Sequence, residues 1–173
     1  MFAATLHEVE GEERLRFGSG DLLWLPVGYA PALRLLAGFD TSGRWRVVWQ
    51  GRPAAGVYYW FDCWPQPWMG VTVFEELAFG HRLTSSRARE ALDRLGLLQD
   101  GVTLDRPMLV LERFDALRVA LARALLCDCG LLLMEQPDAG ISDAQRRWLR
   151  GWLRDWLRAD RSRAVAVTSA VDA

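Results

Sequence analysis

The chain contains no lysine, so all 21 of its basic residues are arginine. This absence excludes every mechanism that needs a lysine amine, such as a Schiff base or the phosphate-binding lysine of a P-loop. The sequence also lacks the ~18-residue apolar run that a membrane span requires, and its beginning has no signal-peptide pattern. Three cysteines are too few for a disulfide framework, so we expect a reducing, cytoplasmic compartment.

The remaining composition is that of an ordinary globular domain. Of the 173 residues, 51% are hydrophobic and 25% are charged, which is enough to bury one sizeable core. The 21 basic residues are balanced by 22 acidic ones, so the overall charge argues against a general nucleic-acid binder.

Cys127 and Cys129 follow a predicted helix and are expected to be free thiols. Cys63 and the two histidines lie too far from them in the sequence to complete a zinc site, so we expect no metal site.

Alternating strand and helix patterns predict an α/β fold. The predicted strands cover residues 2–9, 12–17, 21–25, 44–49, 56–61, 130–135 and 164–168. The predicted helices cover 31–38, 73–80, 86–95, 114–127 and 143–159. The first two strands form an N-terminal β hairpin. We expect one domain, 1–173, with a helical subdomain of about 73–112 inserted in the α/β core.

Three segments carry a resemblance to a known family. They read TVFEELAFG at 72–80, RVALARAL at 118–125 and LLLMEQPDAG at 131–140. In this order and at these separations they resemble the ATP-binding cassette (ABC) ATPase subunits of ABC transporters. Within that family the resemblance is greatest to importers of the cobalt and energy-coupling type. The resemblance covers about residues 18–173. It implies a P-loop NTPase-like three-layer α/β fold, ATP hydrolysis and a membrane permease as partner.

The segment at 26–31 stands where that family has its phosphate loop, GxxxxGK[ST]. Counting back from the following helix places Tyr29 at the lysine and Ala30 at the hydroxyl residue. Counting forward from the preceding strand makes Gly28 the first glycine and leaves the loop about five residues short. In both alignments no cation and no hydroxyl remains for phosphate or Mg²⁺. We expect Arg34, one turn deeper in the helix, to be solvated or ion-paired.

The resemblance also places the acidic motif and two switch positions. Glu135 and Gln136 stand where the family has an aspartate for the metal and a glutamate that accepts a proton from water. Glu135 keeps the charge, whereas Gln136 is no base but can still orient a water. Asp62 stands near the metal-sensing glutamine, with Gln66 as its rival, and Ser169 replaces the histidine that follows the last strand.

The family's signature loop, LSGGQ, corresponds to Leu111, Glu112, Arg113, Phe114 and Asp115. Its hydroxyl and glycine N–H groups hold the γ-phosphate of the partner subunit. Here Glu112 and Asp115 put carboxylates at that place, and the side chains of Arg113 and Phe114 obstruct a close backbone approach. We expect Arg113 to pair with the neighbouring acids. Since both the phosphate loop and the signature depart from the pattern, pairing with an intact ATPase would damage both composite sites.

Six of the nine tryptophans occur at four-residue spacing in two ladders. They are Trp60, Trp64 and Trp68 in the first, and Trp148, Trp152 and Trp156 in the second. The first ladder runs through a proline-rich loop that in the family borders the permease-docking groove, so either partner docking or a small internal core explains it. The second lies on an amphipathic helix with Arg150, Arg154 and Arg158. This helix either packs on the sheet or meets a partner or membrane surface.

Together these features predict a protein like an ABC ATP-binding subunit that has lost its nucleotide-site motifs. We expect a pseudo-ATPase that needs no cofactor and acts as a cytoplasmic accessory or regulatory subunit, peripheral to the membrane through its partner. The expected partner is an ABC-type permease, an intact ATPase subunit or both, with a dimer as one assembly and no nucleic acid. Two alternatives stay open: a weak but active transport ATPase using Mg-ATP, and a protein-interaction module that works through the Trp/Arg helix.

Overall fold

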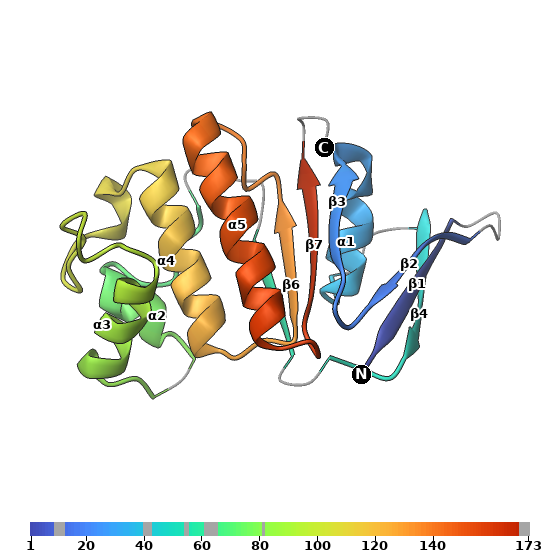
Figure 1. The fold of residues 1–173 in the computed structure, drawn as a ribbon, viewed down its shortest axis with the longest axis horizontal. Helices are drawn as coiled ribbons and strands as arrows, with labels where there is room; N and C mark the ends of the chain where they lie inside the picture. The colour runs from blue at the N-terminus through green and yellow to red at the C-terminus, as the bar shows by residue number, and fades with distance from the viewer. Residues whose placement is uncertain (9–12, 40–42, 54–55, 61–65, 81, 170–173) are drawn as a thin grey trace. The chain divides into compact units, whose positions relative to one another are not determined.

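The computed structural model describes residues 1–8, 13–39, 43–53, 56–60, 66–80 and 82–169. Two compact units form the chain (Figure 1). The first combines residues 1–62 with 129–173, and the second is 63–128. Every predicted strand and helix is present, with ends within two residues of those expected.

The first unit contains two sheets. The antiparallel sheet, in the order β2-β1-β4, consists of β1 (Ala3–Glu8), β2 (Glu13–Gly18) and β4 (Trp45–Gln50). The parallel sheet, in the order β3-β7-β6-β5, consists of β3 (Leu22–Pro26), β5 (Val57–Trp60), β6 (Leu131–Glu135) and β7 (Ala164–Ser169). The predicted N-terminal hairpin is confirmed, because β1 pairs antiparallel with β2.

Helices cover both faces of the parallel sheet. Helix α1 (Ala30–Leu36) packs between the two sheets, where Leu33 shares a core cluster with Ala166. Helix α5 (Asp143–Ala159) covers the opposite face (Figure 1). Successive side chains of a strand alternate between faces, so β7 directs Ala166 toward α1 and Val167 toward α5. The predicted α/β fold, with an N-terminal antiparallel region and a parallel sheet, is confirmed.

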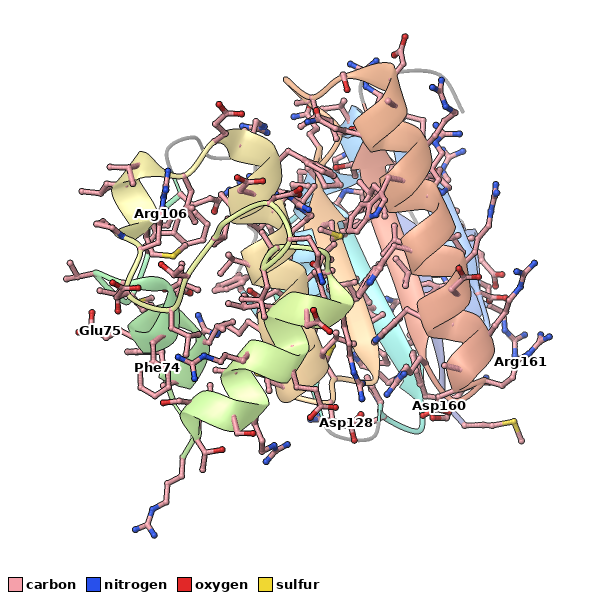
Figure 2. The ribbon with its side chains drawn as sticks, turned by 60° about the vertical axis from the view of Figure 1, so that its left-hand side comes forward. Phe74, Glu75, Arg106, Asp128, Asp160 and Arg161 are labelled. Carbon is pink, nitrogen blue, oxygen red and sulfur yellow. The ribbon has the colours of Figure 1, made fainter. Side chains whose placement is uncertain are left out.

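Local signals in the sequence fix the ends of α5. A capping box starts it: the Ser142 side chain accepts from the Gln145 backbone N–H at 3.3 Å, and the Gln145 side chain accepts from the Ser142 N–H at 2.8 Å. Asp160, with an extended backbone, ends the helix just before β7 (Figure 2). Within the described part of the chain, no helix is long and apolar enough to cross a bilayer.

The described part of the second unit is mainly helical. It contains α2 (Val73–Ala78), α3 (Ser85–Arg94), the 3₁₀ turn η2 (Met108–Val110) and α4 (Arg113–Leu126). A capping box of Thr72 and Glu75 starts α2, and the Thr84 side chain caps α3. Both caps satisfy backbone donors that a helix start leaves open.

A buried ion pair ties α2 to α4. The Glu76 side chain is 5% exposed, and its Oε1 lies 2.5 Å from Nη1 of Arg123. Its other oxygen accepts from the backbone N–H groups of Met69 at 2.7 Å and Gly70 at 3.0 Å. A single carboxylate therefore holds a helix and the preceding loop in place.

Candidate functional site

The carboxyl edge of the parallel sheet brings together most of the predicted nucleotide-site residues. These are Gly28, Tyr29, Ala30, Glu135, Gln136 and Ser169. The register aligns the strand ends, because Pro26 is paired with Ser169 and Glu135 with Thr168. Ligands of open α/β sheets bind at this edge. Asp62, also predicted for this site, lies outside the described residues.

The connection from β3 to α1 is a single tight turn. The 3₁₀ turn η1 (Val27–Tyr29) follows β3 directly, and α1 begins at the next residue with Pro31 in its first turn. The Tyr29 ring packs on Trp45, with ring centroids 5.2 Å apart. The side chain that one alignment places at the phosphate lysine is thus an apolar contact to β4.

An ion pair occupies the middle of this edge. Arg34 of α1 donates to the carboxylate of Glu135 through two bonds, Nε to Oε1 at 2.6 Å and Nη2 to Oε2 at 2.8 Å. The Glu135 side chain is 1% exposed, whereas that of Arg34 is 46% exposed. Such a two-bond fork adds both energy and geometric specificity to a guanidinium–carboxylate pair. Of the two expected states of Arg34, solvated or ion-paired, the structure shows the ion pair, with Glu135 as the partner.

Tyr59, on the neighbouring strand β5, completes the cluster. Its hydroxyl donates to Oε1 of Glu135, so three of the roughly four lone-pair positions of the carboxylate are taken. Burial, and then the bond to Glu135, raise the pKa of the Tyr59 phenol well above its ordinary value. The hydrogen bonds to Glu135 likewise raise the pKa of the Arg34 guanidinium. Tyr59 therefore stays a neutral donor, and the two charges of the cluster compensate each other.

This arrangement does not fit a magnesium–nucleotide complex. A metal ion at Glu135 would have to displace the guanidinium that already neutralises the carboxylate. Among the described residues, no three histidine, cysteine, aspartate or glutamate side chains are grouped to hold a metal. The loop at 26–31 offers no cationic side chain to a phosphate.

A second polar contact at this edge joins the predicted Ser169 to Asp138, a residue that was not predicted for the site. Ser169 Oγ donates to Oδ2 of Asp138 at 2.5 Å, and Asp138 is 2% exposed. Its Oδ1 is buried without a hydrogen-bond partner. Gln136 adopts a left-handed backbone with φ of 43°, and its N–H donates to the Thr168 carbonyl at 2.9 Å. Asp138 belongs to the segment 131–140 that carries the family resemblance, but the sequence assigned no role to it.

The signature-loop residues belong to the second unit. Helix α4 begins at Arg113, and the Glu112 side chain makes no capping bond. Asp115 pairs with Arg118 at 2.5 Å, and the guanidinium of Arg118 lies 4.7 Å from the Phe114 ring centroid. The guanidinium one helical turn later thus reaches the Asp115 carboxylate, and the expected pairing of Arg113 with the neighbouring acids stays a prediction.

Arg118 is the centre of this cluster. Its side chain is 7% exposed and also bonds Asp100, with Nη1 and Oδ2 2.7 Å apart. The same Nη1 donates to the Leu95 carbonyl at 3.2 Å. Two carboxylates and a carbonyl thus compensate one buried cation, and two of the signature-loop side chains serve this internal contact.

The two tryptophan ladders divide between core and surface. Trp60 is 3% and Trp156 5% exposed, so these two rings are core residues rather than surface docking candidates. Trp148 and Trp152 are half-buried. The Trp152 and Trp156 rings stack at 6.4 Å, and Arg163 lies 4.7 Å from the Trp156 centroid. Of the two alternatives for the second ladder, packing on the sheet therefore applies to Trp156.

The first ladder lies only partly within the described residues. Trp64 falls outside them, and Trp68 is half-buried. The backbone N–H of Trp68 donates to the carbonyl of Gln66 at 2.9 Å. Gln66 is the alternative to Asp62 for the position of the metal-sensing glutamine. Gln66 is 8% exposed and belongs to the second unit.

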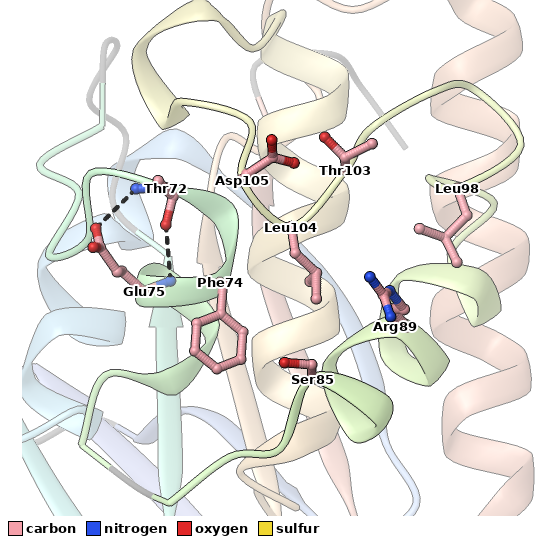
Figure 3. Close-up of a pocket in the computed structure, with 9 residues that line it drawn as sticks. All are labelled: Thr72, Phe74, Glu75, Ser85, Arg89, Leu98, Thr103, Leu104 and Asp105. Carbon is pink, nitrogen blue, oxygen red and sulfur yellow. Dashed lines mark hydrogen bonds between the residues drawn. The ribbon is translucent and has the colours of Figure 1, made fainter.

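A cavity of about 550 Å³ lies within the second unit (Figure 3). Its lining consists of Thr72, Phe74, Glu75, Ser85, Arg89, Leu98, Thr103, Leu104 and Asp105. Glu75 is bound to the capping box. A hydrogen bond from Thr103 lowers the pKa of Asp105. The predicted site residues are not among this lining.

Comparisons with known proteins find ATP-binding proteins of transport systems as relatives. No family model matches the chain. It is 33% identical over 162 residues to the sulfate/thiosulfate import ATP-binding protein CysA of Bordetella bronchiseptica, covering 80% of this chain and 46% of that protein. It is 32% identical over 120 residues to the energy-coupling factor transporter ATP-binding protein EcfA2 of Symbiobacterium thermophilum, covering 65% and 40%. The chain spans about half the length of the curated relatives that it matches.

Solved structures share the fold. CbiO1 of Clostridium perfringens, part of the ABC transporter complex cbiONQ, superposes with a TM-score of 0.70 at 15% identity, covering 97% of this chain and 78% of that one. MJ1267, an ATP-binding cassette of an ABC transporter, superposes with a TM-score of 0.73 at 18% identity, covering 99% and 83%. At these identities the likeness shows the fold alone.

Proposed function

Because the chain belongs to the ATP-binding cassette family of ABC transporters, we propose that it is an ATP-binding-subunit-like protein that no longer uses nucleotide. In this proposal it acts as a non-hydrolysing accessory or regulatory subunit. The observation that carries the proposal is the ion pair of Arg34 with Glu135 at the carboxyl edge. A protein side chain supplies there the positive charge that a metal ion would bring.

The phosphate loop supports the same conclusion. A working loop aims several backbone N–H groups and a lysine at the phosphates. Here Pro26 and Pro31 have no N–H, and the Tyr29 ring contacts Trp45 instead of projecting a cation. The loss of these donors removes most of the electrostatic attraction for a nucleotide.

The acidic motif supports the absence of hydrolysis. Gln136 has no lone pair that takes up a proton at neutral pH, and loss of a general base slows a reaction by about 10²–10⁴-fold. Glu135 is bound by Arg34 and Tyr59. Neither side chain is therefore available for the work that the family pattern assigns to it.

The partner in this proposal is an ABC-type permease or an intact ATPase subunit at the cytoplasmic face of the membrane. CbiO1, which shares the fold, is described as part of a transporter complex. The half-buried Trp68, Trp148 and Trp152 are the aromatic side chains best suited to such a contact. Substituting Trp148 and Trp152 by alanine is expected to weaken co-purification with a co-expressed permease while the chain stays folded. Equal co-purification would remove α5 from the docking surface.

Calorimetric titration with Mg-ATP up to millimolar concentration tests the nucleotide part of the proposal. We expect no saturable heat, with EcfA2 of Symbiobacterium thermophilum titrated in parallel as the positive control. Micromolar binding would correspond to about 8 kcal/mol of contacts and would refute the proposal. Slow ATP turnover that Glu135→Gln abolishes would instead favour the alternative of a weak transport ATPase.

A further inference from the structure

A small cavity lies beside the carboxyl end of α5, within the first unit. It measures about 200 Å³ and is lined by Gly20, Leu22, Arg154, Leu157, Arg158 and Arg161. We call the three arginines the arginine cradle. Leucine side chains and a glycine complete the lining, so every charged group that lines the cavity is positive.

Acidic side chains of the protein do little to compensate the positive charge of the arginine cradle. Among the described residues, the Arg154 and Arg161 side chains have no ion-pair or hydrogen-bond partner. Arg158 lies 3.2 Å from Asp155, but both side chains are about three-quarters exposed, at 73% and 75%. A pair this exposed to water compensates little charge. Arg154 and Arg158 are also one helical turn apart, where like charges repel.

The acids beside the cavity are engaged elsewhere. Asp21, between the lining residues Gly20 and Leu22, accepts from the Gly18 N–H at 2.8 Å. Asp160, labelled next to Arg161 in Figure 2, accepts from the Ser162 N–H at 2.9 Å and from its hydroxyl at 2.8 Å. These hydrogen bonds lower the pKa of Asp160 and hold its carboxylate in the turn that leads to β7. Over residues 154–163, at the carboxyl end of α5 and in the turn that follows, there are four arginines but only two aspartates. An excess of positive charge therefore remains at this end of the helix.

We propose that the arginine cradle binds the phosphate group of a phosphomonoester. Guanidinium forks match phosphate oxygens in geometry and charge. A volume of about 200 Å³ is below the ~300–1,000 Å³ of pockets that enclose drug-sized ligands, so it suits one anionic group rather than a whole nucleotide. The free carbonyl groups at the carboxyl end of a helix repel anions. The arginine side chains, and not the backbone of α5, would therefore be the source of affinity.

The cradle is separate from the proposed vestigial nucleotide site. Leu22 starts β3, whereas the Arg34–Glu135 pair lies at the other end of the strands. The two edges of the sheet are roughly 13 Å apart along a five-residue strand. Phosphate binding at the cradle and nucleotide binding at the carboxyl edge can therefore be tested independently.

The test measures thermal unfolding of the full chain in inorganic phosphate against chloride at equal ionic strength. A ligand of the folded state raises the midpoint in a saturable manner. We expect saturation for the wild type, and roughly tenfold weaker affinity for Arg154→Gln and for Arg161→Gln. Arg147→Gln is the matched control, because it removes the same charge from α5 outside the cavity. All four proteins are expected to unfold alike in chloride, since the substituted side chains are exposed.

Sedimentation with vesicles distinguishes a lipid headgroup from a soluble phosphate compound. If a lipid supplies the group, phosphatidic acid vesicles retain the wild type and Arg147→Gln but release Arg154→Gln, whereas phosphatidylcholine vesicles retain none. If a soluble compound supplies it, only the phosphate titration responds. A flat phosphate titration together with equal sedimentation on both vesicles would overturn the proposal. An equal loss in Arg147→Gln would overturn it too, because bulk charge would then explain the binding.

Discussion

Arg34 and Glu135 lie 101 positions apart in the chain and meet through two hydrogen bonds of 2.6 and 2.8 Å. One belongs to the helix that follows the first parallel strand, and the other ends the strand β6. The carboxylate is almost fully buried, so the guanidinium provides its charge compensation. This pair links the fold to the proposed function, because it occupies the place where the family pattern puts a metal-binding carboxylate.

We predict that Arg34→Ala lowers the free energy of unfolding by about 1–3 kcal/mol. Removing one partner of a fully buried pair costs about 3–5 kcal/mol, and the 46% exposure of Arg34 reduces that value through solvent screening. The double variant Arg34→Ala, Glu135→Gln should recover part of the loss, since no unpaired charge stays buried. Urea unfolding of the two variants and the wild type measures this. A single variant within 0.5 kcal/mol of the wild type would contradict a stabilising role.

Tyr59 predicts a specific response to alkaline pH. Its pKa is raised in the folded chain, so above pH ~10 the unfolded chain loses a phenolic proton that the folded chain keeps. Stability therefore falls as the pH rises through this range, by up to about 1.4 kcal/mol per pH unit for one proton. Tyr59→Phe should show a shallower fall between pH 10 and 11. Identical slopes for the two proteins in urea unfolding would contradict the buried hydrogen bond.

Much of the fold could be predicted from the sequence because its signals are local. The apolar run at 131–135 and the capping box at Ser142 each specify an element without reference to the rest of the chain. The turns at 27–29 and 108–110 were not predicted. Each is a single turn that follows a proline, and it has too few residues for a periodic pattern.

The candidate site was predictable only in part. Motif order indicated that Glu135 and Ser169 belong to one edge, and the register of the parallel strands brings them there. The partners of these residues were not visible, because Arg34, Tyr59 and Asp138 reach them from other elements. Side-chain pairing across distant segments depends on packing that no periodicity encodes.

Glu76→Ala is expected to destabilise the second unit by about 3–5 kcal/mol. The substitution leaves Arg123, whose side chain is 18% exposed, without its carboxylate, and it strips two backbone N–H groups of their acceptor. Arg94→Ala is the control, because it breaks an exposed pair with Glu90 at 64% and 61% exposure. That change should stay within about 1 kcal/mol. Equal effects of both substitutions in chemical unfolding would show that burial of the Glu76 pair adds nothing.

Gly70→Ala is expected to destabilise the chain by about 1–3 kcal/mol through steric overlap. An added Cβ would lie 2.2 Å from the Glu76 backbone nitrogen and 2.5 Å from the Glu75 carbonyl carbon, and backbone atoms cannot turn away as a side chain can. Gly28→Ala is the matched control, since no heavy atom other than those of Gly28 and its two chain neighbours lies within 4 Å of its added Cβ. We expect it to change stability by no more than about 0.5 kcal/mol. Thermal unfolding of both variants decides: a Gly70→Ala midpoint equal to that of Gly28→Ala would mean that the loop before α2 yields without cost.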